Sequence, residues 1–78
     1  MTIQAPHFRE FLKSELQRRQ SKNPRYSLRA FARTLQISPA QLSQLLSGKR
    51  NLTMNLVDQI AERLSLSPRQ KRKLVMES

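Results

Sequence analysis

The sequence contains no cysteine, a single glycine and only five acidic residues among its 78. Without cysteine, the chain can form neither a disulfide nor a thiolate-ligated metal site. A glycine-rich phosphate-binding loop is excluded as well, because one glycine cannot supply it. No apolar run approaches the roughly 20 residues of a membrane-spanning helix, and no signal-peptide pattern precedes the first charges. We therefore expect a soluble protein located in the cytoplasm.

Groups suited to catalysis are also scarce. His7 is the only histidine, and so near the N-terminus we expect it to be a surface residue. Asp58 and Glu62 stand four residues apart, and we expect them on a solvated helix face rather than in an acid–base pair. The sequence thus indicates a protein that is not an enzyme and that has no cofactor and no metal site.

Basic residues dominate the charge, since 15 Lys and Arg against 5 Asp and Glu give a net charge of +10. No acidic residue occurs between residues 16 and 57, a segment that holds Arg18, Arg19, Lys22, Arg25, Arg29, Arg33, Lys49 and Arg50. Repulsion within such a segment destabilises a compact domain unless a polyanion binds it. The charge pattern points to nucleic acid as the partner, with an anionic membrane surface as the weaker competitor.

Apolar residues recur at helical spacing throughout, and no run alternates as a half-buried strand would. The pattern predicts one all-α domain over residues 1–78, with helices at about 6–20, 28–35, 39–47, 54–64 and 68–77. The expected core combines their apolar faces: Phe8, Phe11, Leu12, Leu16, Leu28, Phe31, Ala32, Leu35, Leu42, Leu45, Leu46, Val57, Ile60, Ala61, Leu64, Leu74 and Val75.

Only three residues, Gln36 to Ser38, separate the second and third predicted helices. So short a connection forces the third helix to cross the second steeply, and Ala32 supplies the small residue that the crossing point needs. The third helix has a clear start at Ser38-Pro39 and an expected left-handed end at Gly48. This is the geometry of a helix-turn-helix over about residues 28–47, whose second helix enters the DNA major groove.

The helix over residues 39–47 has two unlike faces. Leu42, Leu45 and Leu46 cluster on one side, whereas the opposite side carries small and amide side chains. Glutamine can form a bidentate pair with adenine N6 and N7, serine can donate or accept, and an alanine methyl can touch the thymine methyl. We therefore predict four base-reading residues: Ala40, Gln41, Ser43 and Gln44.

Positive charge borders this face instead of lying on it. Arg29 and Arg33 are on the preceding helix, and Lys49 and Arg50 follow directly. The helices that begin after Ser27 and Ser38 would also aim backbone N–H groups at phosphates. The phosphate contacts expected from this placement are Ser27, Arg29, Arg33, Ser38, Ser47, Lys49 and Arg50.

The segment 28–49, LRAFARTLQISPAQLSQLLSGK, resembles the DNA-binding motif of the Cro/C1-type helix-turn-helix family, the lambda-repressor-like domains. The shared pattern comprises the small Ala32, the apolar Leu35, the turn 36–38, the core leucines and the closing Ser-Gly-Lys. The resemblance implies a five-helix fold in a transcription regulator that binds double-stranded DNA with a preferred sequence. It also implies a contact to the DNA backbone at Asn51.

Three further segments, FREFL, NPRYSLRAFAR and LLSGKRNLT, resemble the N-terminal module of a narrower group of bacterial regulators. This resemblance implies that the 78 residues are a fragment of a longer chain. Because a short reading helix covers only a few base pairs, useful affinity should require a dimer on a two-fold site or a further domain, and we expect a homodimer in the full-length protein.

Two positions depart from the family pattern. Gln36 stands where the turn usually has glycine, and a non-glycine residue at positive φ costs roughly 1 kcal/mol, so we expect a distorted turn. Pro39 and Ala40 replace longer polar side chains at the start of the reading helix. That leaves Gln41 and Gln44 as the only long base readers.

Two alternative partners remain open. The basic helix at 68–77 would suit a protein-interaction or anionic membrane-surface module, although its apolar face is short. Its cations are Arg69, Lys71, Arg72 and Lys73. RNA is a further alternative, but the sparse aromatic residues mostly fit the core, which leaves few stacking platforms for single strands.

Overall fold

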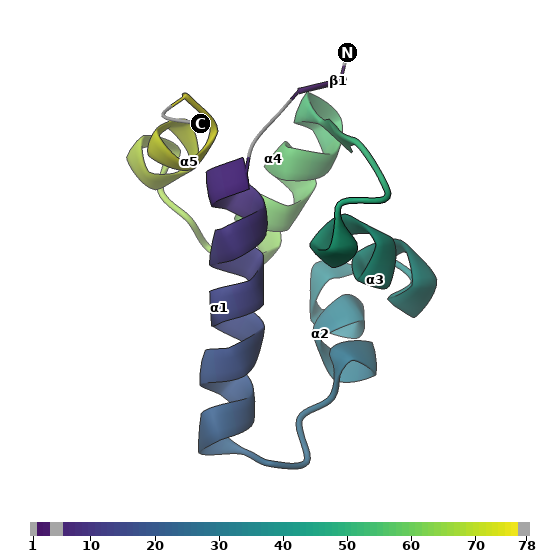
Figure 1. The fold of residues 1–78 in the computed structure, drawn as a ribbon. Helices are drawn as coiled ribbons and strands as arrows, with labels where there is room; N and C mark the ends of the chain where they lie inside the picture. The colour runs from purple at the N-terminus through teal and green to yellow at the C-terminus, as the bar shows by residue number, and fades with distance from the viewer. Residues whose placement is uncertain (1, 4–5, 77–78) are drawn as a thin grey trace.

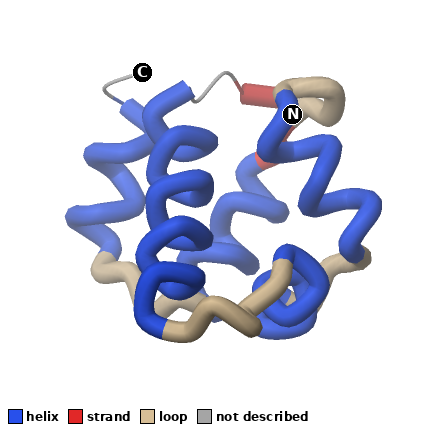
Figure 2. Tube along the Cα trace, turned by 60° about the horizontal axis from the view of Figure 1, so that its bottom comes forward, coloured by secondary structure: helices blue, strands red, loops and turns tan. Residues whose placement is uncertain are grey.

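The computed structural model describes residues 2–3 and 6–76. Within them the chain forms β1 (Thr2–Ile3), α1 (Pro6–Lys22), α2 (Leu28–Leu35), α3 (Pro39–Ser47), β2 (Leu52–Thr53), α4 (Met54–Arg63) and α5 (Pro68–Met76). Figure 2 shows how completely helix dominates the trace, with the strands only small red segments. The all-α class and the five helices expected from the periodicity are confirmed.

Side-chain caps set the starts of four helices. Ser27, Ser38 and Thr53 each accept a hydrogen bond from the backbone N–H three residues later, at 3.0 to 3.2 Å. At α5, the Ser67 hydroxyl accepts from the Gln70 N–H while the Gln70 side chain accepts from the Ser67 N–H, both at 3.1 Å. This reciprocal capping box satisfies two backbone donors that the first helical turn leaves unpaired.

Three helices end with a residue in the left-handed conformation: Gln36 (φ 59), Gly48 (φ 81) and Ser65 (φ 58). In each case the next N–H donates to a carbonyl five residues earlier, from Ile37 to Ala32, Lys49 to Gln44 and Leu66 to Ala61, at 2.9 to 3.0 Å. This Schellman arrangement satisfies carbonyls that the helix leaves without a donor. Only Gly48 adopts it without a Cβ.

The end of α1 differs from the expectation. The helix continues two residues beyond the predicted Gln20, to Lys22, and the Asn23 N–H still donates to the Arg19 carbonyl at 3.0 Å. Helical bonding therefore reaches the Asn-Pro turn itself. For the fifth helix, the predicted end near Glu77 lies outside the described residues.

The two short strands are not foreseen by the periodicity, which predicts no strand. β1 pairs antiparallel with β2, so that Thr2 faces Thr53 and Ile3 faces Leu52. Strands of two residues are too short to show alternation, and their partners lie about 50 residues apart in the chain. Leu52 is fully buried and joins the core although the helical pattern omits it.

The apolar helix faces meet in one core. Its fully buried members are Phe8, Leu12, Phe31, Ala32, Leu35, Leu42, Leu45, Leu52, Val57 and Ile60. The other predicted core residues surround these, Ala61 nearly buried and Phe11, Leu16, Leu28, Leu46, Leu64, Leu74 and Val75 partly buried. Because no disulfide supports so small a domain, this packing has to supply most of its stability.

Helix α1 lies in the middle of the domain, between α5 on one side and α2 and α3 on the other (Figure 1). α3 packs against both α1 and α2, while α5 packs against α1 from the other side. An ion pair between Lys71 Nζ and Asp58 Oδ1, at 2.7 Å, ties α5 to α4. The outward faces of α3 and α5 consequently belong to opposite flanks of the molecule.

Candidate nucleic-acid interface

The corner between α2 and α3 positions the site. Ala32 on α2 and Leu42 on α3 are fully buried, and Ile37 in the turn packs against the same core. A small residue on α2 lets the two helices approach closely, and the three-residue connection holds them at an angle. The short connection and the packing on α2 therefore help to set the direction of α3.

The turn is regular, so the expectation of a distorted corner is wrong. Gln36 takes φ 59 and ψ 41, the left-handed region that normally favours glycine. Its N–H donates to the Arg33 carbonyl at 3.1 Å, and the Ile37 N–H donates to the Ala32 carbonyl at 3.0 Å. The unfavourable backbone angle is thus offset by a complete set of turn hydrogen bonds.

A side chain from α4 supports the same corner. Gln59 Nε2 donates to the carbonyls of Leu35 and Gln36, at 3.1 and 3.2 Å. These are carbonyls at the end of α2 that need an external donor. Sequence reasoning did not find this contact, because Gln59 is one of several glutamines and lies 23 residues from Gln36.

One face of α3 is open to solvent. Ala40, Ser43, Gln44 and Ser47 are exposed, whereas Gln41 is half-buried. Opposite them, Leu42 and Leu45 are fully buried and Leu46 is partly buried. Four of the five α3 side chains predicted to contact bases or phosphates thus share one accessible, uncharged surface, and Gln41 stands at its margin.

The N-termini of α2 and α3 are free to attract anions. The Ser27 and Ser38 hydroxyls are exposed and act as caps, accepting from the N–H groups of Ala30 and Gln41. Each hydroxyl keeps its own proton to donate. Neither helix has an acidic residue in its first turn, so no carboxylate neutralises the positive end of either helix dipole.

The cations predicted to border α3 are accessible. Arg29, Arg33, Lys49 and Arg50 are all exposed, as is Asn51. None of these four cations forms an ion pair with any residue that the structure describes. Their charge is therefore available to a polyanion.

Two other cations of the acid-free segment share one carboxylate as an ion-pair partner. Glu15, just outside that segment, pairs with Arg18 at 2.6 Å and with Arg19 at 3.4 Å. The hydrogen bond from Arg18 is the main reason why the pKa of Glu15 lies below its usual value. Partial burial acts in the opposite direction and raises the pKa, while Arg19 lowers it further. Arg19 also lies over the rings of Tyr26 and Phe31. These two arginines thus belong to the scaffold, and the sequence overstated the unbalanced charge.

The loop after α3 is held more firmly than its sequence indicates. Arg9 Nη2 on α1 donates to the Arg50 carbonyl at 3.1 Å. Arg50 Nε in turn donates to Gln44 Oε1 at 3.0 Å. The first contact has no local sequence signal, because Arg9 and Arg50 are 41 residues apart. The second joins residues six apart, across the end of α3.

The three residues considered for catalysis lie on α1 and α4, away from the α3 surface. His7, Asp58 and Glu62 are exposed, and Asp58 is paired with Lys71. Among the described residues there is no cluster of three histidine, cysteine, aspartate or glutamate side chains able to hold a metal ion. The chemistry available here is hydrogen bonding and charge.

A helix-turn-helix family model matches residues 17–71, from the second half of α1 into α5. The chain belongs to the Cro/C1-type helix-turn-helix family. No curated protein and no solved structure matches the chain. The matched residues include the whole of α2, α3 and α4.

Membership gives the general activity. Cro/C1-type helix-turn-helix domains bind DNA in transcription regulation, and the family is not one of enzymes. Throughout residues 2–3 and 6–76, no helix combines the length and apolar character that crossing a membrane would take.

Proposed function

We propose that this domain binds double-stranded DNA with a preferred sequence, with α3 in the major groove and the bordering cations on phosphates. The observation that carries the proposal is the composition of the open α3 surface. Ala40, Ser43, Gln44 and Ser47 are exposed and uncharged there, while four exposed cations without ion pairs to any described residue lie on α2 and directly after α3. A slim, hydrogen-bonding helix face flanked by positive charge is what major-groove reading requires.

The roles follow from position. Ala40, Ser43 and Gln44 would face base edges, and the half-buried Gln41 would reach a base only from the margin of the groove. The phosphate contacts would come from the caps Ser27 and Ser38, the cations Arg29, Arg33, Lys49 and Arg50, and the polar residues Ser47 and Asn51. Phosphate contacts fix the position on the duplex, and base contacts supply the sequence preference.

The size of α3 argues for an assembly. Its nine residues are about 14 Å long at 1.5 Å per residue, which corresponds to only about 4 base pairs. The proposal therefore includes a homodimer on a two-fold site, formed by a longer chain of which these residues are the N-terminal module. It also places the protein in a bacterial cytoplasm, in contact with the nucleoid.

Selection of bound duplexes from a random pool tests the proposal. We expect an enriched motif and an affinity whose logarithm falls linearly with the logarithm of salt concentration, by about 0.9 per phosphate contacted. Three to four cationic contacts give a slope between about −2.7 and −3.6 per domain. A pool that stays random after selection, despite salt-dependent binding, would contradict sequence preference.

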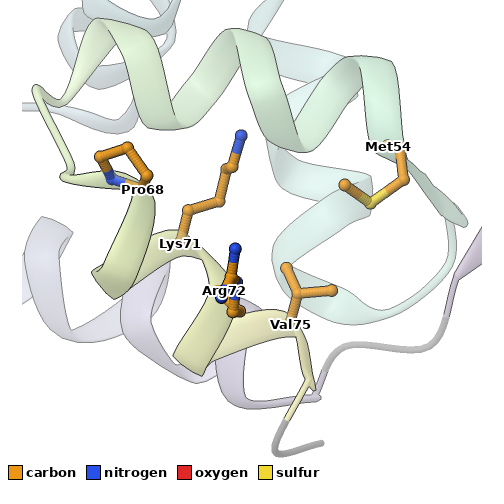
Figure 3. A pocket seen from close by; sticks show the side chains of 5 residues that line it. All are labelled: Met54, Pro68, Lys71, Arg72 and Val75. Atoms are coloured by element: carbon orange, nitrogen blue, oxygen red, sulfur yellow. The ribbon is translucent and has the colours of Figure 1, made fainter.

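A groove between α4 and α5 favours a second candidate function, which is protein docking. It has a volume of about 300 Å³ and is lined by Met54, Pro68, Lys71, Arg72 and Val75. Figure 3 shows Met54 and Val75 on facing sides of the hollow, with Pro68 at its other end. Met54 is a large hydrophobic residue with 38% of its surface exposed to solvent. Methionine side chains are flexible and adapt readily to different partners.

The charges at this groove suit an acidic partner segment that carries one aliphatic side chain. Of the two cations that line it, Lys71 is paired with Asp58. Arg72 is exposed and makes no ion pair with any described residue. A second copy would bring like charges together, and a membrane surface is less well supported because Leu74 and Val75 pack against the core. Binding of a glutamate-rich peptide with a single leucine, lost in Arg72→Glu while duplex binding persists, would support docking. Equal binding to both proteins would exclude the groove.

A further inference from the structure

The side chains of Gln44 and Arg50 form a pair at the open surface of α3. Arg50 Nε donates to Gln44 Oε1 at 3.0 Å, and both residues are exposed. Gln44 is the long side chain on the surface that would face the bases. Arg50 was expected at the border, on a phosphate, but its side chain instead reaches back to the base-reading residue.

The backbone holds Arg50 in this place from two sides. After the left-handed Gly48, the N–H groups of Lys49 and Arg50 both donate to the Gln44 carbonyl, at 2.9 and 3.2 Å. The Arg50 carbonyl accepts from Arg9 Nη2 of α1 at 3.1 Å. Arg9 itself is partly buried and its Nε is shielded from solvent, so it is less mobile than a fully exposed arginine. The backbone of Arg50 is therefore held before any ligand arrives, at a place from which its side chain reaches Gln44.

The hydrogen bond fixes which way the Gln44 amide points. A glutamine amide has one accepting oxygen and one donating nitrogen. Because Oε1 faces Arg50, Nε2 is turned away and remains free to donate. No hydrogen bond from the two terminal nitrogens of Arg50 is recorded within the described part of the chain. The two side chains together thus present mainly donors.

Donors of this kind match one purine better than the other. Guanine offers two acceptors, N7 and O6, on its major-groove edge, whereas adenine offers the N7 acceptor beside the N6 donor. A free glutamine reads adenine by accepting from N6 through Oε1. Here a cation already engages that oxygen, which makes acceptance from N6 the weaker option.

We propose that Arg50 determines specificity through Gln44, and that the pair reads a guanine where Gln44 alone would read an adenine. The proposal rests on the proposed function, since it concerns the bases that the α3 surface contacts. It goes beyond that function by naming the base and by assigning Arg50 a positioning role in place of a simple phosphate contact.

The test uses duplexes that differ only at the position read by Gln44. That position is found as the one whose base preference disappears in Gln44→Ala. Wild type should prefer guanine over adenine there. Arg50→Lys keeps the positive charge but loses the planar guanidinium whose Nε–H donates to Gln44, and Arg50→Met loses both the charge and the donor. In each variant we expect the ratio of guanine to adenine affinity to fall by at least about tenfold, the effect of losing one bidentate base contact.

Lys49→Met is the matched control. Lys49 is an adjacent exposed cation whose side chain makes no hydrogen bond to the α3 surface. Its loss should weaken all duplexes alike and leave the ratio unchanged. Circular dichroism and thermal unfolding of each variant establish that it is folded before its affinities are compared.

The possible outcomes distinguish failure of the Arg50 proposal from failure of the proposed DNA binding. If wild type prefers adenine, or if Arg50→Lys and Arg50→Met weaken both duplexes equally, Arg50 only contacts phosphate and the inference is overturned while duplex binding stands. If wild type shows no salt-dependent duplex binding at all, the proposed function itself fails and the inference with it.

Discussion

Gln59 on α4 donates to the carbonyl of Gln36, the left-handed residue at the corner between α2 and α3, across 3.2 Å. The same amide nitrogen also donates to the Leu35 carbonyl. One side chain therefore connects the body of the domain to the turn that sets the direction of α3. A residue of α4 thus contributes two hydrogen bonds to the corner that precedes α3.

Gln59→Ala should lower the free energy of unfolding by about 1 kcal/mol, because two helix-end carbonyls lose their donor. Urea unfolding at neutral pH measures this change. Gln17→Ala is the matched control, since Gln17 is exposed on α1 and its change should stay within about 0.5 kcal/mol. Equal effects of the two substitutions would show that the Gln59 contact does not stabilise the corner.

The two left-handed positions that flank α3 should respond in opposite directions. Gln36→Gly removes the Cβ at φ 59 and should raise the free energy of unfolding by about 1 kcal/mol. Gly48→Ala should lower it by a similar amount. A Cβ at Gly48 would meet no atom within 4 Å, so its penalty comes from the backbone angle alone. Thermal unfolding resolves both, at about 4–8 °C per kcal/mol.

Glu15 should give the domain a specific sensitivity to acid. Its pKa is lowered in the folded chain from the usual 4.5, mainly by the hydrogen bond from Arg18, so the unfolded chain binds this proton more tightly. The stabilisation is then present above about pH 4.5 and is lost as the pH falls through the lowered folded pKa. Urea unfolding from pH 7 to pH 2 should show wild type losing stability more steeply than Glu15→Gln. A constant difference between the two proteins over that range would contradict this.

Base contacts and phosphate contacts should separate in binding experiments. Gln44→Ala should weaken binding to the preferred duplex by about 1–3 kcal/mol and affect other duplexes little. Arg33→Ala should weaken all duplexes alike and reduce the salt slope by about 0.9. Lys73→Ala on α5 removes a charge from the opposite flank and should change neither. The assignment of Gln44 is wrong if its loss weakens preferred and random duplexes to the same degree.

The sequence was sufficient for the elements whose signals are local. Ser27, Ser38 and Gly48 mark helix ends through caps that act within three to six residues, and the structure has all three in those roles. The leucine spacing in α3 likewise separated its buried side from its open side. Such features need no knowledge of the rest of the chain.

The contacts that could not be predicted are those between distant segments. Nothing near Arg9 indicates that it holds the Arg50 carbonyl 41 residues away, and nothing in a two-residue strand indicates its pairing with Leu52 and Thr53. The pairing of Arg18 and Arg19 is different, because their partner Glu15 lies only three and four residues earlier on the same helix, just before the acid-free segment begins. Pairing of side chains depends on which helices meet, and that is decided by the whole core.

The most direct measurement of the central claim is an amide chemical-shift titration of the domain with a selected duplex at moderate salt. Binding through the open surface of α3 predicts the largest changes at Ala40, Ser43 and Gln44, including the Gln44 side-chain amide, with smaller changes at Arg29 and Arg33. Changes concentrated on α5, with α3 unaffected, would contradict the account.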